Sequence, residues 1–301
     1  MSDRKVQVAG SSLLWAVVLT ATKLIVGLFT GSLGILAEAL HSALDLLAAG
    51  VTLYAVRQSA RPADRDHPFG HGKFENFSAF VETLLLVLTS VWILWEAQER
   101  LRDPAFAGPR TSVWGFLVIG FAIWVDWHRS RALARVARET GSQALEADAL
   151  HFQSDILSSA AVLLGLGGAA LGLPQADPIA AVVVALVVLH VAWGLIRRSV
   201  HALLDRAPEG VADDVRKRVQ AVTGVEEVDS VRVRTSGPDL HAEVVVRLDG
   251  GRPLTWAHDV TDRVEAAVKE GYPEARVTVH AEPLSPAEAP SEEDRETDSL
   301  P

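Results

Sequence analysis

The sequence of 301 residues contains no cysteine and only one methionine and two tyrosines. Without cysteine the chain cannot form disulfides, thiolate metal sites or a catalytic thiol. Any strong metal site must therefore use histidine, aspartate and glutamate. An excess of positive charge is also missing, since 38 acidic residues outnumber 28 basic ones and the formal net charge is −10. Nucleic-acid binding needs a face rich in Lys and Arg, and because no segment provides one we expect no nucleic-acid partner.

Long apolar stretches occupy the first two thirds of the chain. A helix that spans a bilayer needs about 20 mostly apolar residues, and six stretches have about that length or more: residues 8–29, 33–56, 77–98, 113–133, 144–173 and 178–196. We therefore expect residues 1–205 to form an all-α membrane domain of six transmembrane helices. The first stretch contains Lys23 and lacks a small-residue cleavage pattern, which favours a retained helix over a cleaved signal peptide.

Basic residues are distributed unevenly between the two ends of these stretches. If the N-terminus lies inside, three basic residues flank the outer ends and thirteen flank the inner ends, namely Arg4, Lys5, Arg57, Arg61, Arg65, Lys73, Arg129, Arg131, Arg135, Arg138, Arg197, Arg198 and Arg206. Lys and Arg are enriched in the cytoplasmic loops of membrane proteins. The sequence therefore predicts an integral protein of the cell (inner) membrane with both termini in the cytoplasm.

The composition becomes polar after residue 205. Residues 211–222 and 255–271 have the periodicity of amphipathic helices, whereas residues 228–237, 240–250 and 275–282 alternate as strands do. This order predicts a small cytoplasmic α+β domain over residues 206–283, with an αββαβ order of the ferredoxin or metallochaperone type and both helices on one face of a three-stranded mixed sheet. Residues 284–301 carry half of the net negative charge and are expected to form a disordered acidic tail.

Two of the apolar stretches share a motif of ionisable residues. AEALHSALD at 37–45 and ADALHFQSD at 147–155 both read Ala-acid-Ala-Leu-His-x-x-x-Asp, 110 residues apart. Charged residues inside a membrane are costly, so they indicate a functional site. A histidine and an aspartate four positions apart lie on one helical face. Together the two motifs offer four ligands for a tetrahedral zinc ion, His41, Asp45, His151 and Asp155. The alternative is that these side chains only form hydrogen bonds between helices.

Two further groups of candidate ligands lie outside the apolar stretches. In PADRDHPFGHGK, residues 62–73, the side chains of Asp64, His67 and His71 can form a three-ligand site, although a loop rich in Asp and His is more often simply solvated. In the C-terminal domain the candidates are His258 on the second helix and His280 with Glu282 on the last strand. Single histidines of small domains are usually surface residues, so the pattern of this last group does not by itself indicate a site.

Several segments together resemble the cation diffusion facilitator family. They are GSLGILAEALHSALD at 31–45, DHPFGHGKFE at 66–75, ALHFQSD at 149–155, DPIAAVVVAL at 177–186 and LLDRAP at 203–208. With the C-terminal domain included, the resemblance extends over nearly the whole chain up to about residue 283. It implies a homodimeric exporter with six membrane helices per protomer that exchanges a cytoplasmic divalent metal ion for protons.

The resemblance also implies roles for individual residues. The four histidines and aspartates of the paired motifs fall on the family's transport site, and Asp64, His67 and His71 fall on its loop site. His258 and His280 fall on metal-binding positions of the cytoplasmic domain, and Lys73 and Asp205 fall on a charge pair that helps to join the protomers.

The sequence departs from the family pattern at a few positions. Glu38 stands where the family more often has Asp, and Glu282 replaces an Asp. Asp229 and Val245 stand where zinc-transporting relatives often carry histidines. These departures leave open whether the cytoplasmic domain holds a complete binuclear zinc site.

The expected function is therefore divalent metal efflux without enzymatic activity, as a zinc/proton antiporter that works by alternating access. Relatives with histidine in both membrane motifs are mostly zinc transporters, and imidazole favours Zn²⁺, Cd²⁺ or Co²⁺ over manganese; Fe²⁺ is a further candidate. Zinc needs neutral imidazole and ionised carboxylate, so protons compete with it for the same site. One alternative is an intramembrane metalloenzyme with Glu38 or Asp148 as general base, although no HExxH motif occurs. Another is a membrane metal sensor whose C-terminal domain signals to a partner.

Overall fold

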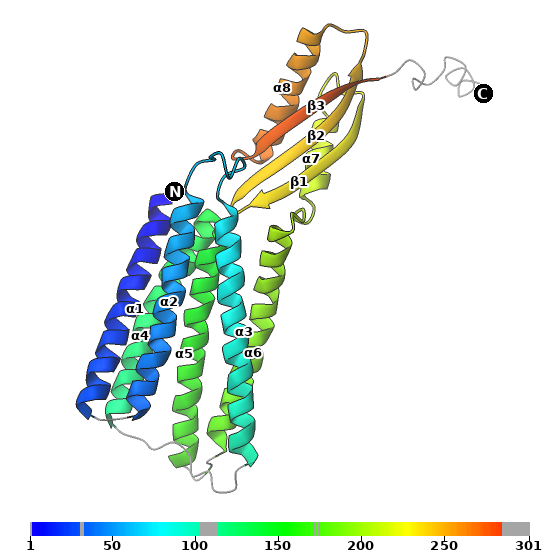
Figure 1. Cartoon of the computed structure of the whole chain (residues 1–301). Coiled ribbons are helices and arrows are strands. Elements are labelled where there is room, and N and C mark those ends of the chain that lie inside the picture. The colour runs from blue at the N-terminus through cyan, green and yellow to red at the C-terminus, as the bar shows by residue number, and fades with distance from the viewer. Residues whose placement is uncertain (1, 31–32, 103–112, 171–172, 174, 285–301) are drawn as a thin grey trace, which may run out of the picture. The chain divides into compact units, whose positions relative to one another are not determined.

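The computed structural model describes residues 2–30, 33–102, 113–170, 173 and 175–284 (Figure 1). The chain divides into two compact units, Met1–Leu204 and Asp205–Pro301. Most of the predicted acidic tail lies outside the described residues, because only Leu284 is described and it ends the last strand.

Six long helices make up the described part of the first unit. They are α1 (Ser2–Thr30), α2 (Leu33–Ser59), α3 (Lys73–Arg102), α4 (Val113–Thr140), α5 (Gln143–Ala170) and α6 (Ala176–Leu203), which run side by side in Figure 1. Each predicted apolar stretch overlaps one of these helices. The shortest has 27 residues, which at about 1.5 Å per residue is a length of about 40 Å and exceeds the bilayer core.

Three of these helices, within the described residues, are both long and apolar enough to cross a membrane: Asp3–Val26, Lys73–Arg102 and Ala176–Leu203. The first unit is therefore a helical domain of the transmembrane type, whereas six crossings stay a prediction. The helix α4 passes beyond its apolar stretch and continues to Thr140. Four of the arginines assigned above to an inner helix end, Arg129, Arg131, Arg135 and Arg138, consequently belong to α4 and not to a loop.

Apolar side chains lie on the outside of this unit, and small or polar ones lie inside. Leu88, Leu164 and Trp193 are more than half exposed, while Ala9, Ala79 and other small residues are buried between the helices. A soluble domain would bury the large apolar residues instead. The arrangement suits an exterior in contact with lipid, and small residues allow helices to pack closely in that environment.

One buried ion pair fixes the end of the bundle where α1 begins. Lys5 Nζ lies 2.8 Å from Glu75 Oε1, and Glu75 is completely buried. Ser59, the last residue of α2, donates a hydrogen bond of 2.7 Å to the same oxygen, and Ser142 donates one to Glu75 Oε2. A buried charge is tolerated only when it is paired and hydrogen-bonded. These contacts therefore hold α1, α2, α3 and the start of α5 together.

The helices α5 and α6 approach each other closely at two glycines. A Cβ atom added at Gly165 would lie 2.5 Å from Oδ1 of Asp177, and one added at Gly168 would lie 2.3 Å from Cβ of Ala176. Both distances are well inside van der Waals contact, so no larger residue fits without a shift of the helices. Asp177 also accepts a hydrogen bond of 3.2 Å from Arg100 Nη1 of α3. This end of α6 is thus joined to α3 as well as to α5.

The second unit has the element order α7 (Val211–Gln220), β1 (Glu227–Ser236), β2 (Asp239–Asp249), α8 (Leu254–Gly271) and β3 (Arg276–Leu284). Its sheet has the order β1-β2-β3, with β1 antiparallel and β3 parallel to β2. Alternate residues of β2 face a core that both helices cover with valines, among them Val215 and Val219 of α7 and Val260, Val264 and Val268 of α8. The predicted small α+β fold, with a mixed three-stranded sheet and helices on one face, is confirmed.

Candidate metal centre

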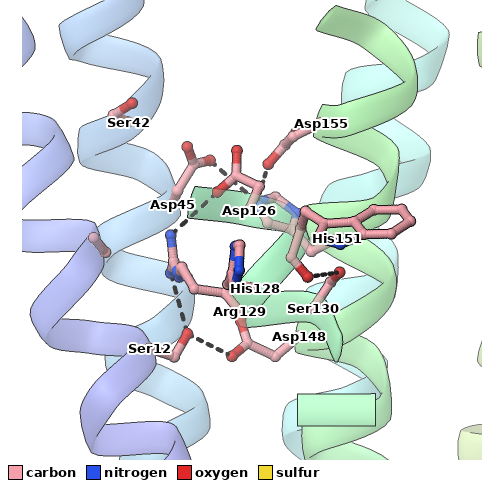
Figure 2. A network of polar contacts seen from close by, with 12 residues as sticks. Ser12, Ser42, Asp45, Asp126, His128, Arg129, Ser130, Asp148, His151 and Asp155 are labelled. Atoms are coloured by element: carbon pink, nitrogen blue, oxygen red, sulfur yellow. Dashed lines mark hydrogen bonds and ion pairs between the residues drawn. The ribbon is translucent and has the colours of Figure 1, made fainter. Parts of the chain in front are cut away.

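Three of the four predicted ligands in the helical unit lie together. Asp45 of α2 and His151 and Asp155 of α5 have ligand atoms that all lie within 4.8 Å of one another (Figure 2). His151 Nε2 is 3.1 Å from Asp45 Oδ1 and 3.7 Å from Asp155 Oδ2. The α-helical repeat places His151 and Asp155 one turn apart on the same face. Close packing of α2 beside α5 supplies the third carboxylate.

The chemistry of this group requires a proton or a metal ion at Nε2 of His151. A carboxylate oxygen only accepts hydrogen bonds, so Nε2 of His151 can lie against two of them if it carries a proton or if a metal ion binds between them. A proton and a metal ion would both bind the same lone pair on Nε2 of His151. The group can therefore hold a proton or a divalent metal ion, but not both through the same atoms.

The fourth predicted ligand, His41, lies in α2 one turn before Asp45, and its side chain lies outside the described residues. The side chain of Glu38 does too. The four-ligand site stays a prediction, of which the structure brings the other three members together.

A buried arginine lies beside these ligands, and sequence reasoning missed it. Arg129 of α4 is only 5% exposed, with Nη1 at 3.5 Å from Asp126 Oδ1 (Figure 2). Its Nη2 donates a hydrogen bond of 3.1 Å to Ser12 of α1, and Ser12 donates one of 3.2 Å to Asp148 Oδ2 of α5. The guanidinium carbon also lies 3.6 Å from the ring centroid of Phe152. An internal cation thus balances carboxylates on two helices.

The loop between α2 and α3 brings its three predicted ligands together. Asp64, His67 and His71 form a second group whose ligand atoms lie within 4.8 Å of one another. His71 Nε2 is 3.3 Å from Asp64 Oδ2, and His67 Nδ1 is 3.5 Å from Asp64 Oδ1. Gly70 has a φ of +86°, which L side chains rarely adopt. This turn lets the chain between His67 and His71 fold back on itself.

Hydrogen bonds within the loop favour the ionised form of Asp64 and fix the tautomer of His71. Oδ1 of Asp64 accepts hydrogen bonds from the backbone N–H of His67 at 2.7 Å and of Asp66 at 3.0 Å. The bond from His67 is the main reason why the pKa of Asp64 lies below its ordinary value. His71 Nδ1 lies 3.2 Å from the carbonyl oxygen of Pro62, which can only accept, so we assign the proton of His71 to Nδ1. Its Nε2 lone pair then faces Asp64, as metal-binding histidines require.

The predicted ligands of the C-terminal unit do not converge. His258 Nε2 lies 3.8 Å from Asp262 Oδ2, and His280 Nε2 lies 3.6 Å from Glu282 Oε1. Both histidines are exposed, and neither belongs to a group of three ligands within the described residues of a single protomer. Asp229 accepts a hydrogen bond of 3.1 Å from Arg247. Metal binding by this unit stays a prediction.

The two residues of the predicted charge pair each have other partners. Lys73 Nζ donates a hydrogen bond of 3.3 Å to the carbonyl oxygen of Leu203, and Asp205 accepts one of 3.4 Å from Arg234. Their pairing with each other stays a prediction.

Two family models match almost the whole chain. Residues 11–204 match the cation efflux transmembrane domain, and residues 207–284 match the cytoplasmic domain of cation efflux proteins. The chain is 31% identical over 293 residues to the cation-efflux pump FieF of Yersinia enterocolitica, which covers 95% of this chain and 96% of that protein. It is 33% identical over 281 residues to FieF of Serratia proteamaculans, 90% of each chain. A solved structure of the MamM CTD in a nickel form has 25% identity and a TM-score of 0.25, and covers 26% of this chain and 100% of that one.

Proposed function

This chain belongs to the cation diffusion facilitator family of cation efflux proteins, and on that premise we propose that it exports Zn²⁺ from the cytoplasm in exchange for protons. The observation that carries the proposal is the convergence of Asp45, His151 and Asp155 from two helices. The name of the two FieF relatives, cation-efflux pump, supports the direction of transport. The ligand set of imidazole and carboxylate supports zinc as the cation, with Cd²⁺, Co²⁺ and Fe²⁺ as possible substrates of the same site.

The proposed exchange follows from competition at the same atoms. Zinc from the cytoplasm binds Asp45, His151 and Asp155, with His41 as the fourth ligand from the next turn of α2. Each ligand must be deprotonated to bind the metal ion. Movement of the helices then opens the site to the far side, where protons bind the ligands and displace the metal ion. The protonated site returns to the cytoplasmic side, so that each cycle moves metal out and protons in.

The proposed topology places all six long helices across the cell (inner) membrane. Both termini then lie in the cytoplasm, together with the loop that carries Asp64, His67 and His71. The helices α2, α4 and α5 carry the polar site residues Asp45, Asp126, Arg129 and Asp155. Polar residues of a transmembrane domain face its interior, which is the position that these side chains have in the proposed topology.

We further propose that the protein is a homodimer and that the loop group binds a second zinc ion. A small α+β domain buries little core by itself. The exposed ligands His258, His280 and Glu282 would complete a metal site in the cytoplasmic domain if a second protomer supplied further ligands. Metal binding would then tighten the dimer by mass action. Sedimentation of the full-length protein in detergent with and without Zn²⁺ tests this link, and a monomer that is indifferent to zinc contradicts it.

Zinc flux into sealed vesicles tests the proposed transport. The purified protein in proteoliposomes should move Zn²⁺ against its own gradient when an opposing proton gradient is imposed, and dissipation of that gradient should abolish the accumulation. Vesicles without protein serve as the control. An intramembrane metalloenzyme or a metal sensor would bind zinc and move none, so the absence of protein-dependent flux contradicts the proposal.

A further inference from the structure

Glu82 of α3 is a buried carboxyl group that the metal centre does not use. It is 1% exposed. Its Oε1 accepts a hydrogen bond of 2.9 Å from Ser78 and also contacts the hydroxyl of Thr52 on α2. Among the described residues, its Oε2 has no hydrogen-bond partner. Within the part of the chain that the structure describes, no lysine or arginine forms an ion pair with it, and none is among the charges that act on it most strongly.

Glu75 on the same helix is also buried, but it has a cation and several hydrogen-bond donors as partners. It precedes Glu82 by seven residues, or about two helical turns, so the two side chains lie on the same face of α3. The carboxylate of Glu75 has the ammonium group of Lys5 and two serine hydroxyls around it. Glu82 has hydroxyl contacts on one oxygen only. A buried carboxylate without a cation is much more costly than a neutral carboxylic acid, and this difference favours a protonated Glu82.

A count of hydrogen atoms supports the same conclusion. The hydroxyl of Thr52 has one hydrogen and two oxygens within reach, the carbonyl of Ala48 at 3.3 Å and Oε1 of Glu82. If Glu82 is ionised, Thr52 can satisfy only one of them. If Oε1 of Glu82 carries a proton, it donates to Thr52, and Thr52 donates to Ala48. Both contacts of the Thr52 hydroxyl are then hydrogen bonds, and Ser78 still donates to Oε1.

Among the described residues, the helices around Glu82 place one acidic group and one imidazole near it, and neither forms an ion pair with it. From α5, Asp148 and His151 act on it electrostatically. Asp148 accepts a hydrogen bond from Ser12, and Ser12 accepts one from Arg129. From α2 the neighbouring group is the Thr52 hydroxyl, and α6 packs the apolar Leu195 against the α3 residue Ala79, one turn before Glu82. Like charges at close range disfavour the ionisation of both.

Glu82 lies near the metal centre, because Ala79, one turn before it, packs with Ala147 and Leu150 of α5, and Leu150 directly precedes His151. Charge at His151 therefore acts on Glu82. A divalent cation bound at His151 brings more positive charge to this position than a protonated imidazole does. Positive charge nearby favours ionised Glu82. Metal binding and proton release from Glu82 are therefore linked by electrostatics, without direct contact.

We propose that Glu82 is a second proton-binding site, which holds a proton while the metal centre is empty and releases it when a divalent cation binds there. The inference rests on the proposed function for its place in transport. The O–H bond of Glu82 breaks, the proton leaves to water on the cytoplasmic side, and the charge of the resulting carboxylate offsets part of the charge of the incoming cation. Proton binding on the return step restores the acid.

Proton release during zinc binding tests the proposal. Calorimetric titration of the full-length protein with Zn²⁺ in buffers of different ionisation enthalpy gives the number of protons released. Glu82→Gln, which imitates the neutral acid, should lose about one released proton per protomer and retain zinc binding. Glu96→Gln is the matched control, because Glu96 lies on the same helix, is partly exposed and pairs with Arg100. An unchanged proton count in Glu82→Gln overturns the proposal.

Infrared spectroscopy of the wild-type protein provides a second test that does not depend on the folding of Glu82→Gln. A carbonyl band of a buried carboxylic acid should be present without zinc and should disappear when zinc binds. Thr52→Val, which removes the proposed acceptor, should shift that band, and an unshifted or zinc-insensitive band contradicts the assignment. These results are independent of flux: vesicles without zinc transport would refute the proposed function, whereas normal flux with an unchanged proton count would refute only the role of Glu82.

Discussion

Nε2 of His151 lies 3.1 Å from Oδ1 of Asp45, although the two residues are 106 positions apart. They belong to different helices, so the contact joins α2 to α5 at the metal centre. A cation at this point is held by both helices at once. Separation of α2 from α5 would remove a charged ligand, which gives helix movement direct control over metal affinity.

Loss of either carboxylate should abolish transport. Asp45→Ala and Asp155→Ala each delete a negatively charged ligand and leave too few donors for a divalent ion. Zinc uptake by proteoliposomes should fall to the level of vesicles without protein in both variants. Asp262→Ala, an exposed aspartate of the C-terminal unit, should retain most of the flux. Full flux in Asp155→Ala would show that the metal centre is assigned to the wrong residues.

The loop group should bind metal independently of the metal centre. His71→Ala removes the ligand atom that faces Asp64, so the protein should bind about one zinc ion fewer per protomer. Transport should fall only partly, because the paired motifs of α2 and α5 remain intact. Equilibrium counting of zinc on the purified protein measures the change. A zinc count equal to that of the wild type would show that the loop is an ordinary solvated segment that binds no metal ion.

Lys5 and Glu75 should be strongly coupled in stability. Removing one partner of a buried ion pair leaves an uncompensated charge and typically costs about 3–5 kcal/mol. Lys5→Met and Glu75→Gln should each lower the free energy of unfolding in detergent by that order. The double variant should recover much of the loss, since no unpaired charge remains. Additive effects of the two substitutions would show that the pair contributes little as a pair.

His241 should make the C-terminal unit less stable in acid. It lies on β2 between Arg234 of β1 and Arg276 of β3. Burial lowers the pKa of His241, and the two neighbouring arginines lower it further. In the unfolded chain a histidine has a pKa of about 6.5. In the folded protein His241 binds a proton only at lower pH. Unfolding therefore takes up a proton between the two values, and stability falls as pH decreases through that window.

Urea unfolding of residues 205–284, which contain their own hydrophobic core, measures this effect in buffer with a chelator. The free energy of unfolding should be lower below about pH 6.5 than above it, and His241→Leu should remove part of that difference. The exposed His258 provides the control, since His258→Gln should keep the wild-type pH dependence. An identical pH profile in His241→Leu would contradict the prediction.

The C-terminal fold was predictable because its sequence signals are local. Strand alternation and helical periodicity identify β1, β2, β3, α7 and α8 from short windows. The parallel pairing of β3 with β2 follows from the crossover through α8, which returns the chain in the same direction.

Partners that depend on helix packing were not predictable in the same way. The spacing of His151 and Asp155 places both on one face of α5, which a sequence can show. Arg129 looked like a basic residue at a helix end, because its partner Ser12 is 117 positions away. The only local signal was Asp126, three residues before it. Lys5 and Glu75 are 70 positions apart and gave no signal.

The close approach at Gly165 has a mechanical consequence for the metal centre. Because no Cβ fits between Gly165 and Asp177, α5 and α6 are in close contact at that point, which would act as a pivot if α5 tilted against α6. Asp155 and His151 lie ten and fourteen residues away along α5, or about 15 and 21 Å. A small rotation about this pivot therefore moves both ligands sideways together and leaves Asp45 behind on α2. The metal ligands would then separate into two groups, with Asp45 on α2 and His151 and Asp155 on α5.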